Sequence, residues 1–301
     1  MNNLINIDTK FDGEDFKNKF LRYLDVESQC TVKTYYNGIS DFLNFTNNKN
    51  IKMPNREDVV DWKNDLKDRT SPSTANTWLV GVKRFFKFLS VYGLYPNVSD
   101  DVKGFKLSKL PKKNVLTEQQ IKDIYSSLTN NKRDKALFGL LITTGLRGVE
   151  VANAKIEDIM LTNNKYCLFI KCKGHSEKDE FVKLPQNVLN DIIDYIGERK
   201  SGYIFISSSN HNKGEGMTTK SIRYIIKNIF RQNGIVDDSI SLHSTRRSFS
   251  CLAYNNGASI FDIQQVLHHA SIQTTTRYLQ MVDRFNNKTE EKIGEILSEI
   301  C

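Results

Sequence analysis

The segment from Ser241 to Gln280 concentrates side chains that are suited to phosphate chemistry. His243 and Arg246 are three residues apart, so on a helix they share a face and can converge on one anion, which a guanidinium binds through a bidentate fork. Tyr278 stands nine positions after His269, and its phenolic oxygen is a candidate nucleophile. A single H-x-x-R pair also occurs in helices that bind nothing, so the prediction depends on the residues around it.

Two further groups of charged residues lie upstream. The string TTGLRGVEVANAKIEDI contains Arg147 and Glu150, and the turn KCKGHSEKDE offers Lys171, Lys173 and Lys178. Two strand-like runs flank this turn, so we expect it to connect the strands of a β-hairpin.

The complete pattern resembles the tyrosine recombinases, also called the phage integrase family, over nearly the whole chain. Members carry a motif like T-G-L-R-x-x-E, a lysine in a β-hairpin, H-x-L-R, L-G-H and a tyrosine about nine residues further on. Only the match of Lys173-Gly174 to a K-G pair favours this lysine over its neighbours. The resemblance assigns the motif positions to Arg147 with Glu150, Lys173, His243 with Arg246, His269 and Tyr278.

The chain departs from the family pattern at three positions. His268 replaces the usual glycine, so either imidazole is a candidate to face the phosphate, and the alignment to the motif selects His269. Arg247 replaces a commonly seen histidine and is expected to face a domain surface or the DNA backbone. Thr245 replaces leucine, which weakens an expected core contact but removes no catalytic group.

The chemistry explains why these residue types occur together. Attack on a phosphodiester places extra negative charge on the non-bridging oxygens, which fixed cations stabilise, and Arg147 and Arg246 fit that role. Tyr278 is the expected nucleophile, and its phosphotyrosyl ester would preserve the bond energy, so that religation needs no ATP. The resemblance implies that this tyrosine holds the 3′ phosphate.

Proton transfers complete the scheme. Lys173 is the expected acid for the departing 5′ oxygen and His243 the expected base. His269 would hydrogen-bond the phosphate, and Glu150 would position other groups. We expect no cofactor, because the arginines take the place of a metal ion and the chain contains no G-x-x-x-x-G-K loop for a nucleotide.

Composition bounds the class of protein. The chain has 301 residues, of which 39% are hydrophobic and 26% charged, as in a folded globular protein, and a net charge of +8 that favours a polyanionic partner. Five scattered cysteines without C-x-x-C spacing disfavour a disulfide framework and a zinc site. The polar N-terminus and the lack of a long apolar run predict a cytoplasmic protein that does not enter a membrane.

The expected fold class is mostly α with a small β-sheet. Residues 1–105 are predicted to form a helical domain, and the resemblance implies that it is a SAM-like domain that binds the core DNA site. Basic residues lie between the aromatic positions of the last helix of this domain: Lys83, Arg84 and Lys87. They are candidate contacts to the DNA backbone, or they simply form the solvated face of that helix. Apolar spacing predicts four helices, at residues 14–24, 31–45, 56–66 and 73–92.

A basic linker at residues 106–116 separates the predicted domains, with the boundary near residue 112. Its Lys109, Lys112 and Lys113 are further candidate DNA contacts. Thr117 and Gln120 have capping-box spacing and open a catalytic α+β domain at residues 117–301. In that domain we expect a helix at 135–144 that ends at Gly145, another helix just beyond Arg147, strands at 166–171, 180–184 and 203–207, and helices after Thr218.

The last segment, 288–300, is amphipathic and is expected to dock on a neighbouring subunit, or alternatively on its own domain. The resemblance further implies that the two domains clamp double-stranded DNA at specific recombination sites, where four subunits assemble. Two other functions remain open from the sequence: a type IB topoisomerase, and a catalytically silent DNA-binding protein of the same fold. Within the family, a resolvase, a transposon integrase and a phage integrase all remain open.

Overall fold

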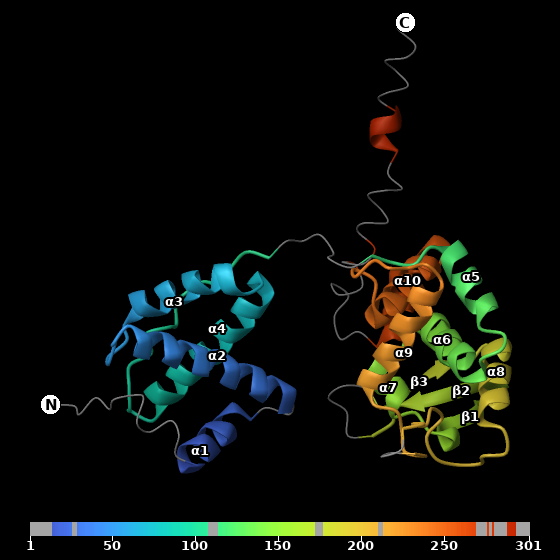
Figure 1. Ribbon diagram of the computed structural model, residues 1–301, viewed down its shortest axis with the longest axis horizontal. Coiled ribbons are helices and arrows are strands. Elements are labelled where there is room, and N and C mark those ends of the chain that lie inside the picture. The colour runs from blue at the N-terminus through green and yellow to red at the C-terminus, as the bar shows by residue number, and fades with distance from the viewer. Residues whose placement is uncertain are drawn as a thin grey trace, which may run out of the picture. The chain divides into compact units, whose positions relative to one another are not determined.

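A computed structural model describes residues 14–25, 29–107, 114–171, 177–209, 213–268, 276, 279 and 288–292, with only the backbone at 14–17. The chain divides into two compact units, residues 1–108 and 109–301 (Figure 1). Within the described residues, no helix combines the length and the apolar character that a membrane span requires.

The N-terminal unit is helical, as predicted. Local signals fix where its helices begin: Asn55 accepts from the backbone N–H groups of Glu57 and Asp58 in a capping box, and Ser71 caps a helix that starts with Pro72. The four helices are α1 (Glu14–Leu24), α2 (Gln29–Asn48), α3 (Arg56–Arg69) and α4 (Pro72–Val91).

Two glycines let the backbones of α2 and α4 touch. A Cβ atom on Gly38 would lie 2.7 Å from the Cα of Trp78, and one on Gly81 would lie 2.8 Å from the Cα of Tyr35. Aromatic side chains from all four helices fill the remaining space, and aromatic rings bury a large apolar area. A larger residue at either glycine would push the two helices apart.

The C-terminal unit surrounds a second hydrophobic core. Its first helix begins at the predicted Thr117–Gln120 capping box, and α6 ends at Gly145 in the left-handed conformation, as predicted. Its described helices include α5 (Glu118–Ser127), α6 (Lys132–Thr144), α7 (Gly148–Ala152), the short 3₁₀ helix η2 (Ile156–Asp158), α8 (Gln186–Ile196), α9 (Thr219–Gln232), α10 (Leu242–Asn255) and α11 (Ile260–Leu267).

A three-stranded antiparallel sheet completes this unit, in the order β1 (Ile159–Thr162), β2 (Lys165–Ile170) and β3 (Glu180–Lys183). Asn163 and Asn164, with φ of 50° and 59°, form the two-residue turn between β1 and β2, and this conformation suits asparagine. The sheet and α10 lie toward opposite ends of the unit (Figure 1).

The expected strand at 203–207 is wrong. Tyr203 and Ile206 form isolated bridges, to Lys155 and Gly216, and the residues between them do not join the sheet. Ile204 and Phe205 are apolar because they are buried in the core. Short apolar runs of this kind do not by themselves distinguish a strand from a buried loop.

Candidate active site

Arg246 lies at the centre of the candidate site and joins three segments of the chain. It is buried in α10, where 2% of its surface is exposed. Its Nη1 donates to the carbonyl oxygen of Gly145 at 2.8 Å, and its Nη2 donates to that of Leu267. The planar guanidinium fork can hold both carbonyls at once. Arg246 therefore fixes the end of α6 and the end of α11 to α10.

Arg147 is held by Glu150 one turn further along α7. Oε2 of Glu150 accepts from the backbone N–H of Arg147 at 2.6 Å, and Oε1 accepts from Nη1 at 2.7 Å. The Glu150 side chain is 1% exposed and that of Arg147 is 32% exposed. The carboxylate thus holds Arg147 in place while part of this side chain reaches solvent.

His243 lies at the surface, at the start of α10. Partial desolvation lowers its pKa from the ordinary value of 6.5, and the positive charges of Arg246, Arg247 and Arg147 lower it further. These charges can act only because the three arginines lie near the imidazole, since electrostatic effects weaken with distance. At neutral pH, His243 is therefore neutral and able to accept a proton.

Gly145 is required where these segments meet. Its φ is +64°, and a Cβ atom there would lie 2.6 Å from Cδ2 of Leu267 and 2.9 Å from Cδ1 of Phe249. Leu267 also packs with Ile263 and with Leu279, which is fully buried. Leu279 directly follows Tyr278, so the chain is anchored on α11 one residue after the expected nucleophile.

The sequence leaves His268 as one of two candidates to face the phosphate, but in the structure its imidazole contacts Glu180. It caps α11 with φ of +49°, in the left-handed region that favours glycine. Its side chain is 8% exposed, Nδ1 lies 2.9 Å from Oε2 of Glu180, and Nε2 has no hydrogen-bond partner among the residues that the structure describes. The backbone conformation costs roughly 1–2 kcal/mol, and an unsatisfied buried polar atom costs about 1–3 kcal/mol.

The three candidate lysines differ in their surroundings. Nζ of Lys178 is paired with Asp158, whereas Lys171 is exposed at the end of β2. Lys173 lies outside the described residues, as do His269 and Tyr278. The pairing with Asp158 makes Lys178 less available for proton transfer.

The sequence predicts that Arg247 faces a domain surface or the DNA backbone, but the structure buries this residue. It is 8% exposed, and its charge acts on His243, so the sequence prediction for this residue is wrong. Thr245 is also fully buried, and its hydroxyl donates to the carbonyl of Leu242 at 2.8 Å. The four-residue spacing of His243 and Arg247 on α10 is the local signal that could have indicated this proximity.

The predicted DNA contacts of the N-terminal unit divide into two kinds. Nζ of Lys83 donates to the carbonyl oxygen of Asp100 at 2.8 Å, so this lysine stabilises its own unit. Arg84 and Lys87 are exposed on α4. The linker residues Lys109, Lys112 and Lys113 lie outside the described residues.

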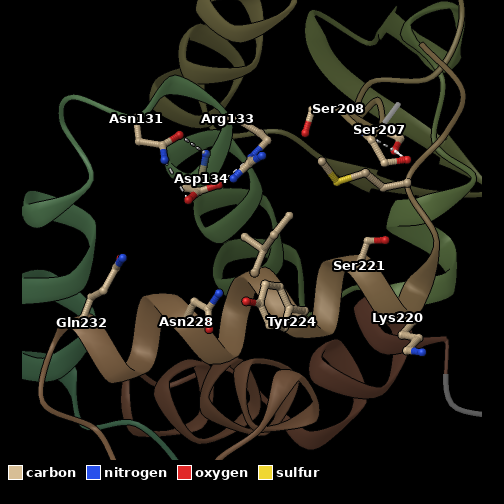
Figure 2. A pocket seen from close by; sticks show the side chains of 13 residues that line it. Asn131, Arg133, Asp134, Ser207, Ser208, Lys220, Ser221, Tyr224, Asn228 and Gln232 are labelled. Atoms are coloured by element: carbon tan, nitrogen blue, oxygen red, sulfur yellow. Dashed lines mark hydrogen bonds and ion pairs between the residues drawn. The ribbon is translucent and has the colours of Figure 1, made fainter. Parts of the chain in front are cut away.

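A large pocket of the C-terminal unit lies elsewhere, beside α9 (Figure 2). Asn131, Arg133 and Asp134 approach one another at one side of it, and Tyr224 and Asn228 project from the helix. Asp134 is already hydrogen-bonded by Asn131 and Arg133. Among the motif residues that the structure describes, none lines this pocket, so we place the candidate site at the arginine cluster.

No cluster of side chains suited to a metal ion occurs in the described part of the chain.

Comparison with known proteins gives a consistent result for both units. A model of the phage integrase family matches residues 114–284, and a model of the N-terminal SAM-like domain of phage integrases matches residues 18–90. Tyrosine recombinase XerA of Pyrococcus furiosus is 29% identical over 91% of this chain and 92% of its own length. Tyrosine recombinase XerD of Listeria monocytogenes is 27% identical over 88% and 93%.

Solved structures share the fold. A XerH site-specific recombinase in a post-cleavage complex with palindromic difH substrate aligns with a TM-score of 0.65 and 19% identity, covering 80% of this chain and 74% of that one. A lambda integrase (75–356) dimer bound to a COC′ core site aligns with a TM-score of 0.67 and 14% identity, covering 86% and 94%.

Proposed function

This chain belongs to the phage integrase family, and from that premise we propose that it is a site-specific DNA recombinase that cuts and rejoins strands through Tyr278. One observation carries the proposal: the fold brings Arg147 close to His243 and Arg246, which lie about a hundred residues further along the chain. Two guanidinium groups beside a neutral imidazole suit a phosphodiester whose negative charge increases in the transition state.

The reaction assigns one task to each group. The phenolic oxygen of Tyr278 attacks the phosphorus while His243 accepts its proton, and the bond from phosphorus to the 5′ oxygen breaks. Lys173 donates a proton to that oxygen, leaving a free 5′ hydroxyl and a 3′-phosphotyrosyl ester. Arg147 and Arg246 stabilise the pentacoordinate phosphorus. Attack by a 5′ hydroxyl of another strand reverses these steps and releases the tyrosine.

The remaining side chains support these steps. His269 hydrogen-bonds a non-bridging oxygen of the phosphate, and Glu150 positions Arg147 through two hydrogen bonds. Each of these bonds has a charged partner, which makes it stronger than a neutral hydrogen bond.

The proposed substrate is double-stranded DNA that carries a specific recombination site. Exposed Arg84 and Lys87 on α4 contact its phosphates, together with the lysines of the linker at 106–116. The XerH structure contains difH substrate, and a lambda integrase structure is a tetramer bound to a Holliday junction. By analogy with that assembly, this chain forms a tetramer on DNA, and its proposed compartment is the cytoplasm.

The segment 288–300 is the proposed link between subunits. Analytical ultracentrifugation of a chain truncated after Asn287 should show weakened assembly on DNA, because the apolar face of this segment is lost. Unchanged assembly would mean that the segment packs on its own domain.

The function is tested by trapping a covalent adduct. Nicked fragments of the source genome are incubated with the full-length protein and with Tyr278→Phe, and SDS-resistant complexes are recovered and sequenced. We expect fragments that share one site, recovered with the wild type alone. DNA binding without an adduct would favour the silent binder. Relaxation of supercoiled DNA that lacks any shared site, without strand exchange, would favour a type IB topoisomerase.

A further inference from the structure

His268 is a costly residue at its position. Glycine adopts a φ of +49° without strain and has no imidazole to bury. His268 has both the left-handed backbone and a buried Nε2 that accepts or donates no hydrogen bond within the described part of the chain. Strained or unsatisfied groups of this kind persist where the surrounding structure uses them. The contact that His268 gains in return is the one between Nδ1 and Glu180, at 2.9 Å.

Glu180 is placed where this contact controls the hairpin. It is the first residue of β3 and pairs with Ile170, the last residue of β2, so the two form the final registered pair before the connection at 171–179. That connection contains Lys173 in the sequence. The contact from His268 to Glu180 therefore holds the hairpin at the Ile170–Glu180 pair, which is the registered pair nearest in sequence to Lys173, the expected acid.

The other end of the contact reaches the arginine cluster. Leu267 directly precedes His268, and its carbonyl oxygen accepts from Nη2 of Arg246. Arg246 also holds the carbonyl of Gly145, two residues before Arg147. Two polar contacts of Arg246, the contact between His268 and Glu180, and the short stretches of backbone between them thus connect the two arginines with Glu180.

We propose that the His268–Glu180 pair is a positioning element that holds the lysine-bearing hairpin against the arginine cluster, so that the lysine can protonate the departing 5′ oxygen. This inference rests on the proposed function and adds a residue pair that the motif of the family, with glycine at position 268, does not supply. Neither residue touches the reacting atoms. The pair acts through the acid, and its loss misplaces the proton donor while the nucleophile and the arginines stay in place.

The test uses two leaving groups. One duplex carries the ordinary phosphodiester at the cleavage site recovered by adduct trapping. The other carries sulfur in place of the bridging 5′ oxygen, and the departing thiolate needs no proton because a thiol is far more acidic than an alcohol. A defect in the acid slows cleavage of the first duplex and spares the second, whereas damage to the arginines or to the nucleophile slows both.

The variants are His268→Gly, Glu180→Ala and the double variant, all in the full-length chain. Glycine suits the left-handed backbone, so His268→Gly should keep the melting temperature of the wild type or raise it. Glu177→Ala is the matched control, because Glu177 is an exposed carboxylate on the same connection. Glu180→Gln keeps an oxygen that accepts a hydrogen bond from Nδ1 and should restore most of the rate.

We expect His268→Gly and Glu180→Ala to cleave the phosphodiester on the order of 10²-fold more slowly, as a small misplacement of a catalytic group does, and to cleave the sulfur-containing duplex within a few-fold of the wild type. The double variant should be no slower than either single variant, because both remove the same contact. Equal slowing on both duplexes, or no slowing, would overturn the proposal. If the wild type forms no adduct with either duplex, the proposed function itself fails.

Discussion

Replacing Glu150 with glutamine should uncouple Arg147 from its support. The carboxylate accepts two hydrogen bonds from Arg147, at 2.6 and 2.7 Å. A glutamine keeps one accepting oxygen but turns an NH₂ group toward the other donor. A hydrogen bond to a charged group contributes about 1.5–3 kcal/mol. The bond to Nη1 is discounted because the Arg147 side chain is 32% exposed, whereas the bond to the backbone N–H is not.

The expected loss is therefore about 2 kcal/mol of unfolding free energy, or a fall of roughly 4–8 °C in melting temperature for a unit of this size. If a similar penalty applies to the transition state, the rate of adduct formation falls on the order of 30-fold. Thermal unfolding by circular dichroism and single-turnover cleavage of nicked DNA measure the two effects.

Glu118→Gln is the matched control. Glu118 also pairs with a basic side chain, Lys122 at 2.7 Å, but both side chains are more than 60% exposed, so neither stability nor rate should change measurably. A Glu150→Gln variant with an unchanged rate would refute a positioning role for this residue, whatever its melting temperature.

Three further predictions concern the same region. Gly145→Ala should lose about 2–4 kcal/mol of unfolding free energy, because the new Cβ would meet a leucine side chain at 2.6 Å and the backbone would be strained. Gly234→Ala is the control: its φ is also positive but the space around it is open, so it should lose about 1 kcal/mol. Equal losses in the two variants would contradict the packing argument. The second-order rate of adduct formation should fall only below pH 6.5, because the lowered pKa of His243 keeps the base neutral above that value. If the midpoint of this fall in rate lies at or above pH 6.5, His243 is not the base. Lys173→Ala should slow cleavage about 10²- to 10⁴-fold and Lys178→Ala less than tenfold, because Lys178 is paired with Asp158; the reverse order would reassign the acid.

Features that depend on a few neighbouring residues could be predicted from the sequence. Thr117 and Gln120 specify the start of α5 through two reciprocal hydrogen bonds within four residues. Gly145 ends α6 because the left-handed conformation there favours glycine. The helices of the N-terminal unit could also be predicted, because apolar spacing depends on residues three and four apart. Their predicted ends differ from the observed ends by a few residues.

Features that depend on distant partners could not be predicted. β1 is an exception, because its turn of two asparagines is a local hairpin signal. The apolar run at 203–207 resembles a strand, and only its burial in the core shows that it is a loop. The carbonyl that Arg246 holds at Gly145 lies 101 residues away. Helical spacing predicts that His243 and Arg246 share a face of α10, but the approach of Arg147 to them follows from tertiary contacts that no local spacing encodes.

The role of Tyr278 is the central claim, and mass spectrometry of the trapped adduct tests it most directly. The SDS-resistant complex is digested with protease and nuclease, and the peptide that retains a nucleotide is sequenced. The account predicts a nucleotide joined through its 3′ phosphate to Tyr278. A nucleotide on any other residue, or a 5′ linkage, would contradict it.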